Sequence, residues 1–287
     1  MRQINAGAGA ARRQGVQHAR GKYLALFNDD TIASPELLAE HWKAHQARPH
    51  VRQCVLGDFR FPPAAQDRAL RRFLTQSPIL FPQVMLKAGE YWEYTYVVTC
   101  NLSVKRDAVL AAGSFDARFR VAEDSDLGLR LSRKGFCVRY VPEALAIHQH
   151  LPFTIPDLIR RATTYGANQL AFLRKHPALP GRGRTFFGML DNEAADRWRA
   201  LVKDRKQAIE SLVDTLTRID SVDFAPFFTM KKGDGTVADE ITRLCQRAVP
   251  AIHWYYHFSG WLRTWEEELV HVSPESLQAV VQDEAYI

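Results

Sequence analysis

The chain has 287 residues, of which 46% are hydrophobic and 24% are charged, and its formal net charge is +6 at pH 7. This length accommodates one large domain or two, and the composition is that of an ordinary globular protein. The sequence has no apolar run close to the roughly 20 residues that span a bilayer, and it carries no signature of nucleic-acid binding. An integral membrane protein and a nucleic-acid-binding protein are therefore not predicted, and the modest positive charge favours an anionic partner only weakly.

The cysteines and the first residues indicate a cytoplasmic protein. The cysteines are widely separated and have neither metal-site nor disulfide spacing, which is typical of reduced, buried thiols. They are Cys54, Cys100, Cys137 and Cys245. Met1 is followed by Arg2 and a stretch of glycine, alanine and arginine without the pattern of a signal peptide.

The first strong element is an apolar segment with polar residues behind it. Residues 5–21 have the pattern of a loop that enters a helix. Residues 22–27 are apolar without alternation, which is typical of a strand covered on both faces. Asn28, Asp29 and Asp30 follow directly. Because ligands collect at the carboxyl ends of strands in open α/β sheets, this turn is a candidate binding site.

Strands and helices then alternate along the first half of the chain. The pattern predicts strands at 51–59, 97–104 and 136–141 and helices at 34–47, 64–75, 105–112 and 122–135. This alternation favours an α/β fold with a mixed, mostly parallel sheet.

The segment 122–135 carries two carboxylates where its helix begins. Glu123 and Asp124 precede leucines four residues apart on one inward face, and Gly135 suits a left-handed cap at the other end. The free N–H groups of a helix N-terminus stabilise carboxylates as anions. An ionised acid held there is well placed to accept a proton, although an isolated acidic pair more often serves only as a cap.

After residue 150 the pattern becomes helical. Three long segments have helical periodicity, at 155–175, 192–219 and 237–270. We therefore place a boundary near residue 151, with an α/β domain at 1–150 and a helical region at 151–287. The last segment carries an aromatic stripe, for which a buried core helix is favoured over a membrane-surface helix. The stripe consists of Trp254, Phe258, Trp261 and Trp265.

Two features of the first domain suit a divalent cation. Asp29 or Asp30 offers the hard oxygen ligands that Mg²⁺ and Mn²⁺ prefer, and His148 follows a short apolar run that also has the character of a strand. A solvated turn and a hydrogen-bonded histidine are the more common roles for such residues taken singly. Their order along the chain, each at a predicted strand end, favours a shared site.

Taken together, these motifs resemble the middle of a family 2 glycosyltransferase. The resemblance covers residues 4–150, and the ordered set is specific although each motif is short. The motifs are Asn5-x-Gly7-x-Gly9-Ala10-Ala11-Arg12, Phe27-Asn28-Asp29-Asp30-Thr31, Asn101-Leu102-Ser103, Gly113-Ser114-Phe115-Asp116 and Glu123-Asp124-Ser125-Asp126-Leu127-Gly128.

This resemblance implies the GT-A fold, a nucleotide-diphospho-sugar donor and a divalent cation, Mn²⁺ or Mg²⁺. Asn28, Asp29 and Asp30 occupy the position of the family's D-x-D motif. The resemblance assigns Asp30 as the direct metal ligand and assigns Asn28, Asp29 and Asn5 to the donor. His148 lies where some members have a histidine metal ligand.

The resemblance also implies an inverting, single-displacement transfer to a hydroxyl acceptor. Asp124 matches the general base that takes the proton from the acceptor, and Glu123 beside it positions the acceptor. Trp92, in an aromatic loop over 76–95, suits stacking on an acceptor sugar and suits core packing equally well. The usual role of the family suggests a glycan or lipid-linked glycan as acceptor, with peripheral contact at the inner face of the membrane as a further option.

The sequence departs from the family pattern at its start. Family members begin with a strand and a P-x-x-N-type nucleotide-binding segment, and nothing before Ile4 matches them. We therefore expect an N-terminally truncated fold that binds a nucleotide poorly and is inactive as it stands. The alternative is a non-catalytic remnant that acts as an interaction or scaffold module.

Overall fold

The computed structural model describes residues 3–62, 68–80, 82–119, 121–149, 154–176, 192–222, 225–228, 230–232 and 235–271. Its chain divides into two compact units. The first unit comprises Met1–Ile155 and Asp214–Pro250, and the second comprises Pro156–Val213 and Ala251–Ile287. The chain therefore leaves the first unit and returns to it before it ends in the second.

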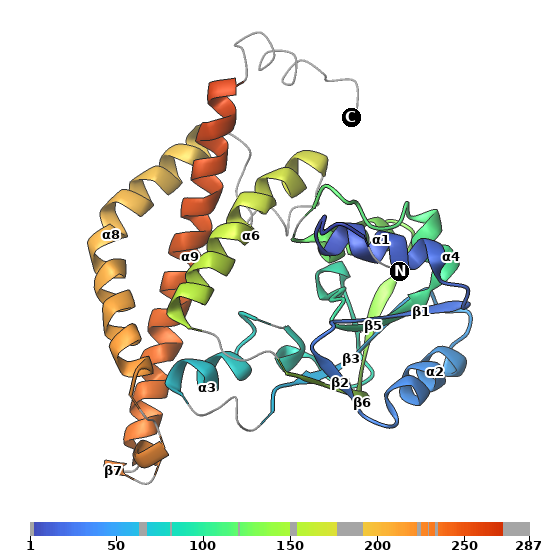
Figure 1. Ribbon diagram of the computed structural model, residues 1–287, viewed down its shortest axis with the longest axis horizontal. Helices are drawn as coiled ribbons and strands as arrows, with labels where there is room; N and C mark the ends of the chain where they lie inside the picture. Colours follow the sequence, from blue (N-terminus) through green and yellow to red (C-terminus); the bar gives the residue numbers. More distant parts are fainter. Residues whose placement is uncertain are drawn as a thin grey trace. The chain divides into compact units, whose positions relative to one another are not determined.

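A mixed sheet forms the centre of the first unit (Figure 1). Its strands are β1 (Tyr23–Phe27), β2 (Thr31–Ala33), β3 (Gln53–Arg60), β4 (Tyr91–Trp92), β5 (Asn101–Lys105) and β6 (Cys137–His148). They lie in the order β1-β5-β3-β6-β2, and β4 pairs with β6. The predicted α/β fold with a mixed sheet is confirmed. Among these described strands, the parallel pairing is confined to β3 and β6, so the expectation that most strands are parallel was wrong.

The helices of the first unit lie close to their predicted positions. They are α1 (Ala8–His18), α2 (Leu37–Ala47), α3 (Ala69–Thr75), α4 (Arg106–Ala111) and α5 (Glu123–Ser132), with the 3₁₀ segments η2 (Pro82–Met85) and η3 (Tyr94–Tyr96). The helix predicted at 64–75 begins at Ala69 in the structure, and residues 64–67 lie outside the described residues. Gly135 has a φ of 79°, as its predicted capping role requires.

Helices cover both faces of the sheet, with α1 and α4 on one face and α2 on the other (Figure 1). Successive strand residues point to opposite faces, so Leu56 joins the core under α1, α4 and α5, whereas Val55 packs beside Ala44 of α2. The side chains of β1, predicted at 22–27, also point to alternating faces of the sheet, and Ala25 is exposed. Complete cover on both faces was therefore wrong at that residue.

The thiols agree with the reduced state that the sequence predicts. All four cysteines are free, and those at positions 54, 100 and 245 are buried. No helix in the described part of the chain is long and apolar enough to cross a membrane.

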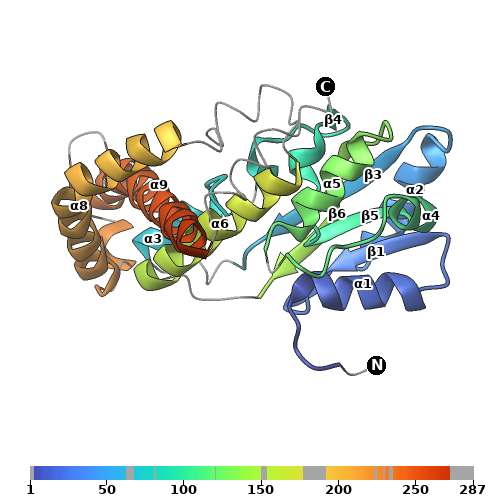
Figure 2. The same ribbon diagram turned by 90° about the horizontal axis from the view of Figure 1, so that it is seen from above.

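Three long helices follow in the chain, namely α6 (Ile155–Lys175), α8 (Asn192–Asp220) and α9 (Val237–His271). Their parts within the second unit pack together, with α9 between α6 and α8 (Figures 1 and 2). The return of the chain to the first unit also contains η4 (Ala225–Phe228), β7 (Lys231–Lys232) and β8 (Gly235–Thr236). The three helices match the predicted helical segments closely because their periodicity is long and strong.

Aromatic side chains form the core of the second unit. The ring of Trp198 stacks on that of Phe258 with centroids 3.8 Å apart, and Trp261 stacks on Trp265 at 5.3 Å. Trp261 and Trp265 are buried, together with Leu170. Trp261 and Trp265 of the aromatic stripe therefore belong to a core, as the sequence favoured, while Trp254 and Phe258 are half-buried.

Candidate functional site

Segments that are distant in sequence meet at the end of β1. Phe27, the last residue of β1, pairs with Asn101, the first residue of β5. Asn28 therefore follows β1 at the place where Thr99 leads into β5. The start of α5 reaches the same place, because the carboxylate of Asp124 accepts a hydrogen bond from the backbone N–H of Thr99. The strand end and the acidic helix start, which are more than 90 residues apart in sequence, thus lie together.

Arg12 of α1 connects these two segments. Its guanidinium makes an ion pair with Glu123, and its Nη2 donates a hydrogen bond to Oδ1 of Asn28, 3.3 Å away. The side chain of Arg12 is 19% exposed and that of Glu123 is 7% exposed, so the pair is largely out of water. A charge pair in such an environment is strongly coupled. The guanidinium of Arg12 therefore connects Asn28, the residue after β1, with Glu123, the first residue of α5.

The contact of Arg12 depends on a close approach of α1 to the segment before α5. A Cβ added at Gly9 would lie 2.9 Å from the backbone oxygen of Phe119 and 3.3 Å from Cβ of Glu123. The sequence motif contains Arg12 without indicating its role. The signal that identifies it is the i,i+3 spacing of Gly9 and Arg12, which places the close approach and the cation on one face of α1.

Glu123 and Asp124 are adjacent carboxylates with little access to water. Glu123 is buried and Asp124 is half-buried. Burial raises the pKa of Glu123, and the neighbouring charge of Asp124 raises it further, while Arg12 lowers it. Burial also raises the pKa of Asp124, against the opposing effects of Arg12 and of the N–H groups of Ser125 and Thr99. A raised pKa makes a carboxylate a stronger base, and two such neighbours titrate as a pair.

The backbone before these carboxylates is strained. Ala122 has a φ of 65° and a ψ of 15°, which is the left-handed region. That conformation costs a non-glycine residue about 1–2 kcal/mol. Strain of this kind persists only where the surrounding contacts hold it, and it is common at functional sites.

Asp30 and His148 form a second pair at the same end of the sheet. Thr31 of β2 pairs with His148 of β6, and this places Oδ1 of Asp30 3.1 Å from Nε2 of His148. The His148 ring is buried, with its centroid 4.7 Å from that of Phe59 and 5.4 Å from that of Phe61. Asp30 belongs to the turn that also carries Asn28, so the two pairs are joined by one short connection.

These residues fit a divalent cation as part of a shared ligand set. Asp30 supplies a hard carboxylate oxygen and His148 an imidazole nitrogen, which are ligand types that Mn²⁺ accepts. Within the described residues no cluster of three or more His, Cys, Asp or Glu side chains could hold a metal ion. A cation with one or two protein ligands completes its shell with water and with substrate phosphates. The pair therefore suits a cation that arrives with a phosphorylated ligand.

Two predicted donor-binding residues lie outside these contacts. Asn5 is exposed, and its Oδ1 accepts a hydrogen bond from the N–H of Gly7 at 3.1 Å. Asp29 is exposed on the turn after β1 and makes no hydrogen bond or ion pair with the described residues. Their donor-binding roles stay predictions.

Trp92 lies at the other end of β6 from His148. It pairs with Val138, which pairs in turn with Cys54 of β3, whereas the opposite end of β6 pairs with Arg60. Cys54 and Arg60 are six residues apart along β3, so the Trp92 end and the His148 end of β6 are separated by roughly 20 Å. Trp92 is half-buried against the core and packs on another ring at 5.2 Å. Its packing role is thus observed, and its contact with an acceptor stays a prediction.

A buried hydrogen-bond network lies behind the site, between α2 and β5. The amide nitrogen of Asn101 donates to the carbonyl oxygens of Asp58 and Ala144, at 2.8 and 2.7 Å. Its Oδ1 is therefore the acceptor for Nε2 of His41, 2.8 Å away. A Cβ added at Gly57 would lie 2.3 Å from the Asn101 amide nitrogen, so only glycine fits beside the network.

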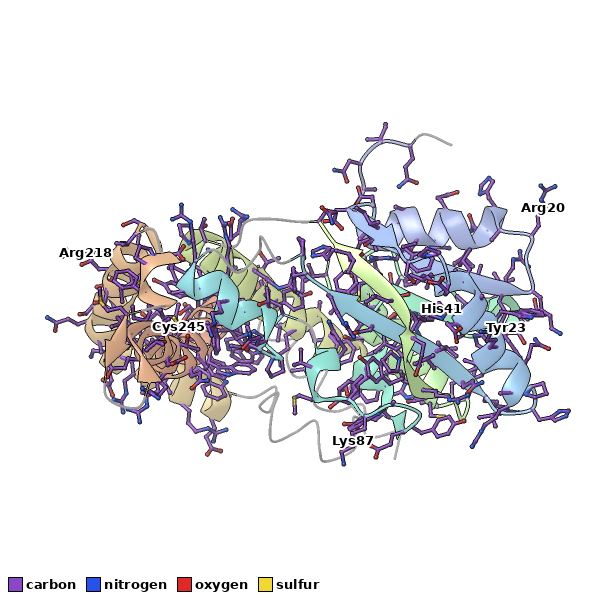
Figure 3. The ribbon with its side chains drawn as sticks, turned by 90° about the horizontal axis from the view of Figure 1, so that it is seen from below. Arg20, Tyr23, His41, Lys87, Arg218 and Cys245 are labelled. Carbon is purple, nitrogen blue, oxygen red and sulfur yellow. The ribbon has the colours of Figure 1, made fainter. Side chains whose placement is uncertain are left out.

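The protonation of this network follows from its partners. Because His41 carries its proton on Nε2, its Nδ1 accepts a hydrogen bond from the Ser103 hydroxyl at 2.8 Å. The same hydroxyl oxygen accepts from Nε2 of His45 at 2.9 Å. The ring of Tyr23 packs on His45 at 4.3 Å, and Figure 3 marks Tyr23 and His41. Burial lowers the pKa of both histidines, that of His45 to about 4.

The comparisons with known proteins agree with this geometry. The family model described as "Glycosyl transferase family group 2" matches residues 23–217. The chain is 27% identical over 193 residues to the "Uncharacterized glycosyltransferase YfnE" of Bacillus subtilis (strain 168). The aligned region covers 52% of this chain and 49% of that protein. It is 32% identical over 181 residues to the "Pre-mycofactocin glycosyltransferase" of Mycobacterium tuberculosis (strain CDC 1551 / Oshkosh). Here the aligned region covers 60% of this chain and 36% of that protein.

The chain spans about half or less of the length of these curated relatives. The match to the family model nevertheless covers more than half of the chain and runs from β1 through α6 and nearly all of α8. Asn28, Asp30, Glu123, Asp124 and His148 all lie within the matched residues, whereas Arg12 precedes them. The chain therefore belongs to glycosyl transferase family group 2.

Proposed function

We propose that this protein transfers a sugar from a nucleotide-diphospho-sugar to a hydroxyl acceptor with inversion, at the end of β1. The observation that carries the proposal is the double contact of Arg12 with Asn28 and Glu123. It joins the turn expected to bind the donor to the helix start expected to bind the acceptor. The two reactants of a single displacement have to meet in this way.

Asp124 is the proposed general base. Its carboxylate is fixed by two backbone N–H groups, those of Ser125 and Thr99. A fixed carboxylate with a raised pKa takes the proton of an acceptor hydroxyl as that oxygen attacks the anomeric carbon. Glu123 is already paired with Arg12 and is assigned to positioning the acceptor.

Asp30 and His148 are the proposed ligands of Mn²⁺ or Mg²⁺. When bound, such a cation supplies positive charge beside the departing nucleoside diphosphate. The role of the chain is to hold the oxygen of the partly exposed Asp30 3.1 Å from the nitrogen of His148, whose ring is buried beside Phe59. Asn28 and Asp29 lie beside this pair on the same turn and are assigned to the donor.

The acceptor that we propose is a glycan or a lipid-linked glycan, and we place the reaction in the cytoplasm. Four free cysteines, three of them buried, support a reducing compartment. The names of the relatives support glycosyl transfer in general, but the donor and the acceptor proposed here are not taken from those names.

The first test measures donor binding by thermal unfolding. UDP-glucose, UDP-N-acetylglucosamine, dTDP-rhamnose and GDP-mannose are each added with and without Mn²⁺. A ligand at 100 times its dissociation constant stabilises the folded state by about 2.7 kcal/mol, which raises the unfolding temperature measurably. We expect at least one donor to act in this way and to require Mn²⁺. Asp30→Ala and His148→Ala should remove the Mn²⁺-dependent part of the shift.

The second test separates proton transfer from binding. Asp124→Asn keeps the size of the side chain and removes the base, so transfer or donor hydrolysis should fall by about 10²–10⁴-fold. The Mn²⁺-dependent thermal shift should remain. A parallel loss of that shift would contradict the assignment of Asp124 as base. If no donor shifts the unfolding temperature of the unmodified chain, a non-catalytic role is supported instead.

A further inference from the structure

A groove with an unequal distribution of charge lies between α8 and α9 in the second unit. Its volume is about 300 Å³. Four of the five charged side chains that line it are basic, namely Arg199, Lys203, Lys206 and Arg263. The helix α8 carries six basic and six acidic side chains in all, yet its three charged residues in the groove are all basic. The positive charge is therefore gathered at the groove and is not a general property of the helix.

Among the described residues, only one of the four cations is closely paired. Arg199 pairs with Asp196 and with Glu266, the latter at 3.0 Å. The ammonium of Lys206 is 4.0 Å from Glu210, at the limit of an ion pair, and the guanidinium of Arg263 is equally far from Glu267. Exposed pairs of this kind are worth little. Lys203 has no ion pair with any residue that the structure describes.

The floor of the groove is apolar. Val202 and Leu262 line it, and both pack into the aromatic core of the second unit. The aliphatic parts of the lysine and arginine side chains extend this floor toward the charged groups at its rim. The groove therefore offers cations and hydrocarbon together, within one pocket-sized space.

We propose that this groove binds the phosphate headgroup of an anionic lipid and attaches the protein to a membrane surface. Lysine and arginine side chains are suited to phosphate oxygens, and basic residues at an anionic membrane strengthen binding by about fivefold each. Free inorganic phosphate would use the cations but not Val202 and Leu262, so the apolar floor favours a lipid as the source of the phosphate. The inference does not rest on the proposed sugar transfer and involves no residue assigned to it.

The test is flotation of the full chain with vesicles of phosphatidylcholine alone or with 30% phosphatidylglycerol. The unmodified chain should bind only the anionic vesicles. Lys203→Glu should weaken this binding by about fivefold or more, and Lys203→Glu combined with Arg263→Glu by about 20-fold or more, whereas Lys203→Arg should retain it. The matched control is Arg205→Glu, which makes the same charge change two residues along α8 at an exposed position outside the groove. It should change binding by less than threefold.

The outcomes are distinguishable. Equal losses for Lys203→Glu and Arg205→Glu would overturn the groove in favour of attraction by total charge. Thermal stabilisation by inorganic phosphate without any vesicle binding would overturn the lipid in favour of a soluble anion. Far-ultraviolet circular dichroism and the unfolding temperature of each variant confirm that it is folded. Failure of the donor-binding test would leave this result unaffected, because flotation requires no nucleotide sugar.

Discussion

At the residue scale, the contacts of Arg12 place an energetic demand on the site. Glu123 is almost fully buried, so its charge depends on the guanidinium beside it. The planar fork of arginine reaches Glu123 and Asn28 together, whereas a lysine ammonium is a single point of charge. Removing one partner of a buried pair leaves the other charge uncompensated, which costs more than removing both.

We therefore predict that Arg12→Met destabilises the protein more than the double change Arg12→Met with Glu123→Gln. The single change should cost about 3 kcal/mol, and the double change less, because no buried charge is then left alone. The measurement is a double-mutant cycle from urea unfolding curves. Strictly additive losses would show that the two side chains do not interact.

The histidine network makes stability depend on pH. The pKa of His45 is about 4 in the folded protein and about 6.5 in the unfolded chain, so the unfolded chain binds more protons between these values. The stabilising contribution is therefore complete above pH 6.5 and is lost as the pH falls toward 4. Between pH 7.5 and pH 5, His45 should cost about 2 kcal/mol of unfolding free energy.

The control for this pH dependence is His45→Gln, which keeps an N–H donor for Ser103 but does not titrate. Urea unfolding is measured at both pH values for the variant and the unmodified chain. The unmodified chain should lose about 2 kcal/mol more than the variant. The difference isolates His45 from other histidines, such as His253 and His257, whose pKa values burial also lowers to about 4. Equal losses in both proteins would contradict the assignment.

At the scale of elements, α6 and α9 meet through glycines. A Cβ added at Gly166 of α6 would lie 1.8 Å from the backbone oxygen of His257. A Cβ added at Gly260 of α9 would lie 2.1 Å from the backbone oxygen of Thr163. Backbone atoms cannot turn aside as a flexible side chain does, so neither position has room for a larger residue. The two helices are therefore held at a separation that only glycine allows.

We predict that Gly166→Ala lowers the unfolding free energy by about 2 kcal/mol or more, because overpacking forces the helices apart. Gly15→Ala is the matched control. Gly15 also lies inside a helix, α1, but nothing lies within 4 Å of its added Cβ. That change should stabilise by about 0.5–1 kcal/mol through helix propensity. Thermal unfolding of both variants tests the contrast, and destabilisation by Gly15→Ala as well would contradict it.

Much of the secondary structure could be predicted because it is local. The long helices have strong periodicity, and the helix that starts at Glu123 has its acids and its glycine where end effects require them. The direction of the strands was harder to predict. An alternation of strands and helices along the chain implies parallel strands only where each helix connects two strands that are adjacent in the sheet. Here α2 leads from β2 to β3, which lie on either side of β6. Pro142 divided one strand into two in the sequence pattern, whereas β6 runs through it beside a register shift.

The candidate site was predictable only in its separate parts. Asn28, Asp30 and His148 follow apolar runs, and this placed them at strand ends. The i,i+3 spacing of Gly9 and Arg12 marks one face of α1, but it does not show that this face joins Asn28 to Glu123, because that contact depends on how α1 packs. Trp92 was open between two roles for a similar reason, since an aromatic side chain suits a core and a binding surface alike.

At the scale of the whole molecule, the two units interleave in sequence. The predicted division at residue 151 is linear, whereas the first unit includes Asp214–Pro250. This return contributes buried side chains, among them Leu216, Cys245 and Val249. Arg68 of the first segment also donates a hydrogen bond to the backbone oxygen of Asp220. Sequence periodicity is local, so it does not show which distant segments pack into one unit.

We predict that residues 1–155 alone do not unfold cooperatively, because they lack the buried side chains of the return. A variant in which a Gly/Ser linker replaces residues 156–213, and which ends at residue 250, keeps both segments of the first unit. It should regain a cooperative transition in urea, followed by near-ultraviolet circular dichroism. A cooperative transition of the 1–155 fragment at the midpoint of the full chain would instead support a domain boundary near residue 151.

The interleaving also sets an order of events during synthesis. A ribosome that has released residue 155 has still to make 95 residues before position 250 emerges. At 5–20 residues per second this delay is roughly 5–20 s. During this delay the first segment of the first unit is complete but lacks residues 214–250, which belong to the same unit. Residues 156–213 of the second unit are made in the same interval. Chaperones that hold nascent chains would act on this protein in that interval.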